Sequence, residues 1–117
     1  MKLVQFKKIG GVVSIRMSVT GTLAWRYVYE ADNYKFSKTN QDPPPYEHAI
    51  GLPSEIKNEI DTWDFQLGNL SHGNVSYEVE ISWMQDANTC QRWKSSGTLT
   101  ASQQAITVSG SAMLVGI

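Results

Sequence analysis

The segment Val75-Ser76-Tyr77-Glu78-Val79-Glu80-Ile81-Ser82-Trp83 decides the fold class, because apolar and polar residues alternate along its whole length. Successive side chains of a β-strand point to opposite faces of the sheet. The apolar residues of this segment therefore share one face, and the serines and glutamates share the other. This pattern is typical of an antiparallel sheet that buries one face and exposes the other to water.

Neighbouring segments extend this pattern into a sheet. The segment Trp63–Leu67 also alternates, and a linker rich in turn-forming residues, 68–74, joins it to the Val75 strand. Asp86-Ala87-Asn88 then turns the chain back into Thr89–Lys94. We expect three consecutive antiparallel strands with Trp63, Tyr77, Val79, Ile81 and Trp83 in the core. This tryptophan-bearing second half resembles immunoglobulin-like sandwiches at the level of the fold, and the resemblance implies no function.

The chain length fits one domain, 1–117, which we expect to be an all-β antiparallel sandwich, immunoglobulin-like or jelly-roll-like, of about seven to eight strands. The single cysteine, Cys90, excludes an internal disulfide. No segment has the features of a signal peptide or of a membrane span, which needs about 18 apolar residues. We therefore expect a cytoplasmic protein, or one released without a signal peptide.

Two glycine-containing turns are expected to form hairpins in the first third of the chain. Gly10-Gly11 follows the short strand Leu3–Phe6, and Thr20-Gly21 precedes the segment Leu23–Tyr29. Two registers are open at the second turn. A three-residue loop ending at Gly21 buries the large apolar residues together, and we prefer it. A two-residue loop instead exposes the row Trp25, Tyr27 and Tyr29, because a slip of one residue moves every side chain to the other face.

The segment Ala31–Leu52 does not alternate and contains Pro43-Pro44-Pro45-Tyr46. Three prolines exclude a central strand, so we expect a loop or an extended edge that packs Tyr46 onto the sandwich. The next segment, Pro53–Ile60, is expected to begin a short helix with Ser54 as its N-cap.

No catalytic, cofactor or metal motif is present, and we expect neither an enzyme nor a metal or cofactor site. His48 and His72 stand in separate loops without a neighbouring nucleophile. Asp61 with Asp64 could contribute to a calcium site, but the sequence does not assemble the oxygen ligands that calcium needs. Residues 1–29 carry five cations and no acid, and the acids of residues 30–64 balance them, so we expect no nucleic-acid partner.

These observations favour a non-enzymatic, lectin-like binding module. Aromatic side chains stack on the apolar faces of sugar rings, and polar loop groups bind the hydroxyls. The candidate stacking residues are Trp25, Tyr27, Tyr29 and Trp93. The candidate hydrogen-bonding residues are Asp32, Asn33, Asp86 and Asn88. The alternative is a self-assembling structural or protein-interaction sandwich that binds no small molecule.

The alternative rests on the C-terminal segment, 95–117, which contains no charged side chain. Exposed sheet edges are usually protected by charges, prolines or bulges. Either these strands are covered within the monomer, or a second subunit covers them, since interface cores are depleted of charge. We expect a homo-oligomer through these strands. Gly110 is expected to mark a bulge or a bend.

Overall fold

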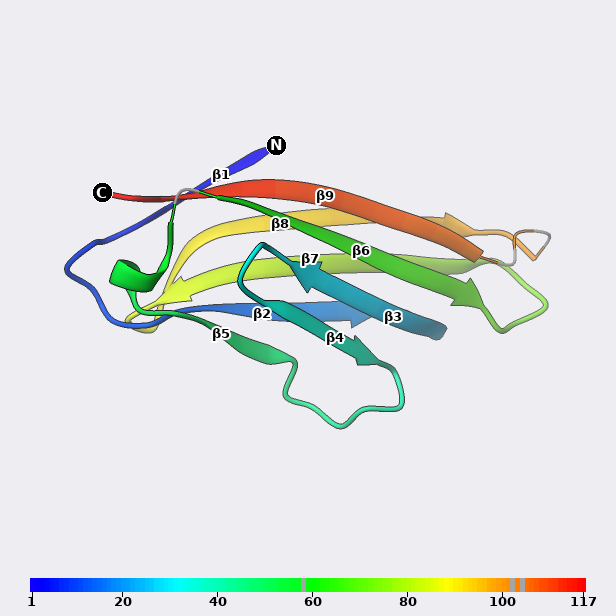
Figure 1. Cartoon of the computed structure of the whole chain (residues 1–117). Helices are drawn as coiled ribbons and strands as arrows, with labels where there is room; N and C mark the ends of the chain where they lie inside the picture. The colour runs from blue at the N-terminus through cyan, green and yellow to red at the C-terminus, as the bar shows by residue number, and fades with distance from the viewer. Residues whose placement is uncertain (58, 102, 104) are drawn as a thin grey trace.

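Two stacked sheets form a β-sandwich in the computed structural model, which describes residues 1–57, 59–101, 103 and 105–117 (Figure 1). Sheet A contains, in spatial order, β1 (Lys2–Phe6), β9 (Ala105–Gly116), β6 (Ile60–Asn69), β3 (Leu23–Glu30) and β4 (Lys35–Thr39). Sheet B contains β5 (Glu47–Gly51), β2 (Val13–Thr20), β7 (Val75–Gln85) and β8 (Asn88–Leu99). The predicted β-sandwich is confirmed.

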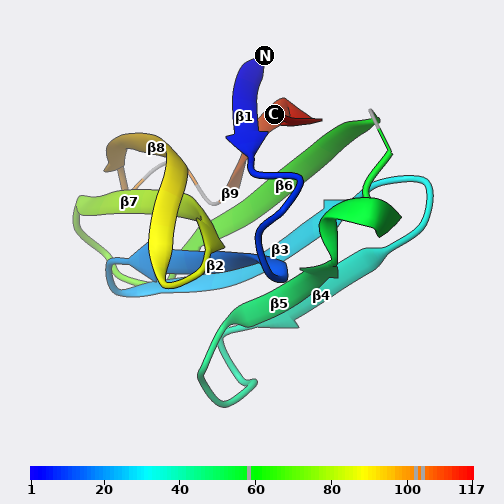
Figure 2. The same ribbon diagram turned by 90° about the vertical axis from the view of Figure 1, so that its left-hand side faces the viewer.

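The described residues form nine strands, more than the seven or eight predicted. The additional strands, β4 and β5, lie in the segment 31–52, and each forms one edge of its sheet. They lie next to each other on one side of the sandwich (Figure 2). Neither strand contains a buried residue, so neither sequence shows the apolar–polar alternation of a strand with one fully buried face. Strand pairing is antiparallel except between β1 and β9, which are parallel.

Most consecutive strands do not pair, and this corrects three predictions. The turns at Gly10-Gly11 and Thr20-Gly21 and the linker 70–74 each carry the chain from one sheet to the other. The Trp63 strand therefore belongs to sheet A, whereas β7 and β8 belong to sheet B. Alternation fixes which face of a strand is buried but does not fix its partner. The preferred burial of the β3 side chains is nevertheless observed, since Leu23 and Tyr27 are buried.

The turn at Asp86-Ala87 does connect a hairpin, as predicted, and it links β7 to β8. Both residues have positive φ, 52° and 62°, as a two-residue hairpin turn of type I′ requires. Gln85 holds this end of the sandwich together. Its side chain accepts a hydrogen bond from the Lys7 amide at 2.8 Å and donates to the carbonyl oxygens of Lys7 and Gly11 at 2.8 and 3.1 Å.

The core lies between the sheets, and its largest fully buried side chains are aromatic. Trp63, Val79, Ile81 and Trp83 are buried, as predicted. Tyr77 is only half-buried, because it lies near the end of β7, where its ring packs over Gly97 of the edge strand β8.

The proline-containing loop and the segment after it follow the predictions in part. Tyr46 packs edge-on against Trp25 with ring centroids 5.0 Å apart, and its hydroxyl donates to the Asp42 carbonyl at 2.7 Å. The short helix is one 3₁₀ turn, η1 (Pro53–Glu55). Its N-cap is Leu52 rather than Ser54, because the Glu55 carboxylate accepts the Leu52 amide hydrogen at 2.9 Å. Residue 58 of the predicted helix segment lies outside the described residues.

Candidate functional site

The structure places the predicted aromatic residues mainly inside the sandwich. Tyr27 and Tyr29 are 1% and 0% exposed, so no ligand at the surface reaches their rings, and this part of the predicted platform is wrong. The physical reason is the register of β3, whose odd-numbered side chains face sheet B. Trp93 also turns inward, and its ring centroid lies 5.1 Å from that of Trp63 and 6.1 Å from that of Phe65.

The predicted polar residues lie in two turns. Asp32 and Asn33 are exposed in the β3–β4 turn. The Asp86 carboxylate accepts the amide hydrogen of Gly11 at 3.1 Å, and Asn88 donates to the Asp86 carbonyl at 3.0 Å. These contacts hold turns together. The eight predicted residues therefore do not converge on one site.

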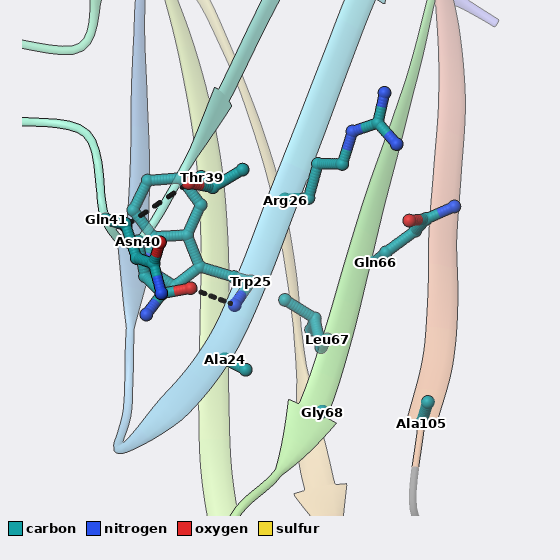
Figure 3. A pocket seen from close by; sticks show the side chains of 10 residues that line it. All are labelled: Ala24, Trp25, Arg26, Thr39, Asn40, Gln41, Gln66, Leu67, Gly68 and Ala105. Carbon is teal, nitrogen blue, oxygen red and sulfur yellow. Dashed lines mark hydrogen bonds between the residues drawn. The ribbon is translucent and has the colours of Figure 1, made fainter.

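One predicted residue, Trp25, is among the residues that line a hollow on the outer face of sheet A, although its ring lies on the other side of β3 from Arg26 (Figure 3). The hollow is open, has a volume of about 400 Å³, and is called the sheet A hollow below. It is lined by Ala24, Trp25, Arg26, Thr39, Asn40, Gln41, Gln66, Leu67, Gly68 and Ala105. Sites for small ligands usually have volumes of about 300–1,000 Å³, so the hollow is large enough for a small molecule.

Strand register arranges the lining residues in two rows across the sheet. Ala24, Gly68 and Ala105 lie opposite one another on β3, β6 and β9 and form a row of small side chains. In the next row Arg26 lies opposite both Gln66 and Thr39. Because the side chains of the first row are small, they leave the space that forms the hollow. The longer side chains of the second row form its polar wall.

The polar wall has free hydrogen-bonding groups. Arg26 and Gln66 are exposed, and within the described part of the chain their side chains form no hydrogen bond or ion pair. The guanidinium group of Arg26 supplies donors, and the amide of Gln66 supplies a donor and an acceptor. In Figure 3 both side chains extend on the side of β3 away from the Trp25 ring.

Trp25 and the β4–β5 loop form the other end of the hollow. Asn40 accepts the amide hydrogen of Trp25 through its side chain at 3.2 Å and donates its own amide hydrogen to the Trp25 carbonyl at 3.1 Å. This double contact fixes the loop against β3 and places the exposed side chain of Gln41 at the rim. The Trp25 ring stacks on Tyr27 at 5.7 Å and is half-buried.

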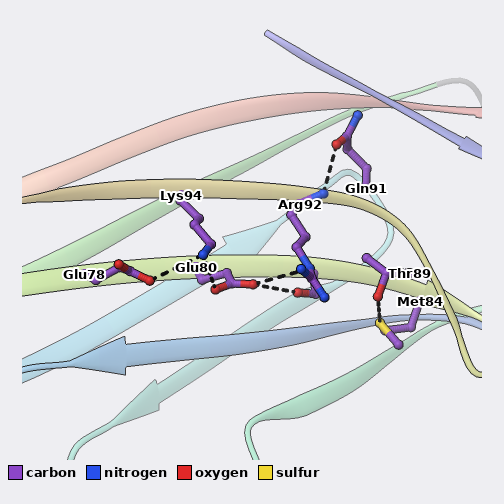
Figure 4. Close-up of polar contacts among 8 residues, drawn as sticks. Glu78, Glu80, Met84, Thr89, Gln91, Arg92 and Lys94 are labelled. Carbon is purple, nitrogen blue, oxygen red and sulfur yellow. Dashed lines mark hydrogen bonds and ion pairs between the residues drawn. The ribbon is translucent and has the colours of Figure 1, made fainter.

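The outer face of sheet B differs, because its charges are paired with one another (Figure 4). Lys94 lies 3.5 Å from Glu80 and 3.7 Å from Glu78, and Arg92 lies 3.7 Å from Glu80. Arg16 pairs with Glu47 on the same face. The unpaired Arg26 on sheet A is therefore the more available cation for a ligand.

The most strongly perturbed titratable groups form a buried network between the sheets. Asp61 is fully buried and accepts hydrogen bonds from the hydroxyls of Tyr29 and Tyr34, both at 2.5 Å. Trp83 donates its indole N–H to the Tyr29 oxygen at 2.9 Å. Burial raises the pKa of Asp61, and the two tyrosine hydrogen bonds oppose this shift. Burial and the neighbouring Asp61 raise the pKa of Tyr29, so it stays neutral.

Perturbed pKa values often mark active sites, but a buried polar network can produce the same shifts. Asp61 has no access to solvent, and so it serves the core rather than a ligand. Asp61 and Asp64 face opposite sides of β6, since Asp64 is exposed and binds Ser109 at 2.5 Å. The possible calcium pair is therefore not formed. Among the described residues no group of three or more His, Cys, Asp or Glu could hold a metal ion.

Sequence reasoning did not select Arg26, Gln41, Asn40 and Gln66. A signal existed for two of them, because Arg26 and Gln66 each stand between two large apolar residues, an alternation that predicts an outward side chain. Their position opposite each other depends on the pairing of β3 with β6, which alternation does not reveal.

Comparisons of the chain with protein-family models, curated proteins and solved structures find no significant match. Within the described residues, no helix has the length and apolar character needed to cross a membrane.

Proposed function

We propose that this protein is a non-enzymatic, lectin-like module that binds a carbohydrate in the sheet A hollow. The observation that carries the proposal is the free polar wall of Arg26 and Gln66 beside the small row of Ala24, Gly68 and Ala105. A sugar ring presents hydroxyls along its rim and C–H groups on its faces. The polar wall matches the hydroxyls, and the small row accommodates the flat apolar face.

The composition of the hollow supports binding rather than catalysis. Its described lining contains amides, a guanidinium, a hydroxyl and apolar groups, and no carboxylate, imidazole or thiol. General acid–base and nucleophilic catalysis depend chiefly on those three groups. The carboxylate with the raised pKa, Asp61, points into the core from a strand whose outward residues line the hollow.

A glycan array probed with the labelled protein tests the proposal. We expect binding to a restricted set of glycans, and we expect Arg26→Ala and Gln66→Ala each to reduce it at least about tenfold, since each removes a direct hydrogen bond to the ligand. Lys35→Ala is the matched control, because Lys35 is an exposed cation on β4 outside the hollow. A blank array, or equal loss in the Lys35 variant, contradicts the proposal.

A second candidate function, self-assembly or protein interaction, is favoured by a different observation. One edge of β9 pairs with β6, whereas its other edge pairs with β1 over only part of its length. A blank glycan array together with a stable oligomer would favour this function.

A further inference from the structure

One half of β9 has a partner on one side only. β6 pairs with β9 over Ala105–Met113, whereas β1 pairs with its other edge only over Ala112–Gly116. Residues 105–111 therefore present an open edge of seven residues in the described structure. An unpaired strand edge is a template for pairing with another chain.

The other edge strands of the two sheets carry charges, and this segment does not. β1 carries Lys2, β4 carries Lys35 and Lys38, β5 carries Glu47, and β8 carries Arg92 and Lys94. Charged residues on an edge hinder pairing with a second sheet. Residues 105–111 contain neither charge nor proline. The open edge is thus the unprotected one among the described edges.

We propose that the open edge of β9 pairs with the same segment of a second copy, antiparallel and centred on Val108. The open edge runs from the start of β9 to the start of its pairing with β1 and contains seven residues. Its central residue is Val108. A two-fold axis perpendicular to the sheet, passing between the two copies of Val108, joins the two copies of sheet A into one continuous sheet. The N-terminal end of each β1 then lies next to the start of the neighbouring β9.

The side chains agree with this register on both faces. On the inner face Val108 meets Val108 of the second copy, and Ile106 meets Gly110. Val108 and Ile106 are only half-buried in one copy, although they face the sandwich interior. On the outer face the exposed Thr107 meets Ser109 of the second copy, so hydroxyl faces hydroxyl. Such cross-strand pairs stabilise a sheet, and a two-fold interface must be self-complementary in this way.

The interface is small, and this sets the expected affinity. Pairing of one short strand buries less than the roughly 1,200 Å² of a stable standard interface, so we expect a reversible dimer with a micromolar Kd. This inference does not rest on carbohydrate binding, because the open edge shares only Ala105 with the lining of the sheet A hollow, and Val108, Thr107 and Ser109 lie outside that lining.

The test is sedimentation velocity of the full chain across a concentration series, for the protein and for the double variant Thr107→Lys/Ser109→Lys. In the dimer each new lysine faces a lysine of the second copy, so we expect the Kd to rise at least about tenfold. In the monomer both positions are exposed, and position 109 lies opposite Asp64, whose carboxylate can pair with the new lysine. The variant should therefore remain folded by circular dichroism.

Two further variants complete the design. Ser37→Lys/Thr62→Lys adds the same charge at exposed positions of the same face, on β4 and β6, and should dimerise like the unmodified protein. Mixing the lysine variant with Thr107→Glu/Ser109→Glu should restore a dimer, because lysine then faces glutamate. The proposal is overturned by a folded protein that stays monomeric at the highest concentration, by a lysine variant that dimerises undiminished, or by a mixture that forms no heterodimer.

Discussion

Gly110 of β9 lies directly opposite Trp63 of β6, and the indole ring of Trp63 fills the space into which a side chain at position 110 would project. A Cβ atom at position 110 would lie 2.6 Å from the ring. The ladder between the two strands continues through this pair without a shift of register, so the predicted bulge at Gly110 is not formed. A glycine is required at position 110 because the indole ring of Trp63 occupies the space that a side chain there would fill.

Gly110→Ala should therefore destabilise the protein by about 1–3 kcal/mol, because the buried indole ring cannot move away without displacing its neighbours. Gly73→Ala is the matched control, since a Cβ there meets no atom within 4 Å. Urea denaturation of both variants measures the difference in the free energy of unfolding. Equal stability of the two variants would contradict the packing described for Trp63.

Asp61 makes a second prediction, because one of its oxygens is satisfied and the other is not. Oδ2 accepts two tyrosine hydroxyls, whereas Oδ1 is buried and has no hydrogen-bond partner among the described residues. Asp61→Asn keeps the acceptor and replaces Oδ1 by a donor, and we expect this donor to bind Glu59, whose charge raises the pKa of Asp61 and whose Oε1 is likewise buried without a partner among the described residues. We expect Asp61→Asn to stabilise the fold by about 1 kcal/mol at neutral pH.

The raised pKa of Asp61 decides the direction in which stability changes with pH. Between the unfolded and folded pKa values the folded chain binds more protons, so stability falls as the pH rises through this window. The asparagine variant should lose that dependence. Asp61→Ala should instead cost about 2–4 kcal/mol, since it leaves the hydroxyls of Tyr29 and Tyr34 without their acceptor. Urea denaturation across the pH range measures both effects, and a destabilised asparagine variant with unchanged pH dependence would refute this role.

His48 makes the opposite contribution to pH dependence. Its ring stacks on Phe36 at 4.6 Å and shares a hydrogen bond of 2.7 Å with the Tyr27 hydroxyl. Burial, followed by the charge of Lys38, lowers the pKa of His48 below its usual 6.5. As the pH falls below 6.5, His48 therefore binds a proton in the unfolded chain before it does so in the folded chain. The stability of the folded state decreases as a result. His48→Gln should reduce the loss of stability between about pH 7 and pH 5, and an unchanged loss would argue against this contribution.

Ala87 occupies the second position of the β7–β8 turn with φ at 62°, a conformation that favours glycine. Ala87→Gly should stabilise the protein by about 0.5–1 kcal/mol, because relief of the strained backbone outweighs the added freedom of the unfolded chain. Thermal unfolding checks this prediction. A lower melting temperature would show that the turn adopts another conformation in solution.

The sequence predicted the sandwich and the buried faces because alternation reports burial directly. Ile81 and Trp83 are core residues for this reason. Partners were harder to predict. Thr20-Gly21 has the composition of a hairpin turn, yet it connects strands of different sheets. A hairpin within one sheet and a connection between the sheets would both bury Leu23 and Tyr27. Only long-range packing distinguishes the two arrangements, and no local pattern records it.

The candidate site was less predictable than the fold. Tyr27 and Tyr29 were candidates because aromatic rings can form either a sugar-stacking surface or part of a core. In the structure both are buried in the core. Arg26 and Gln66 are ordinary outward residues until the pairing of β3 with β6 brings them together. The open edge of β9 likewise depends on where the short strand β1 begins to pair.

The central claim is that the sheet A hollow binds a carbohydrate, and amide chemical-shift mapping tests it most directly. The ¹⁵N-labelled protein is titrated with a panel of mono- and disaccharides at millimolar concentrations. At least one sugar should shift the amide resonances of Ala24, Arg26, Gln66 and Gly68 in a saturable manner, while those of Asp32 and Asp86 remain unchanged. An absence of saturable shifts with every sugar, or shifts confined to residues outside the hollow, would contradict the claim.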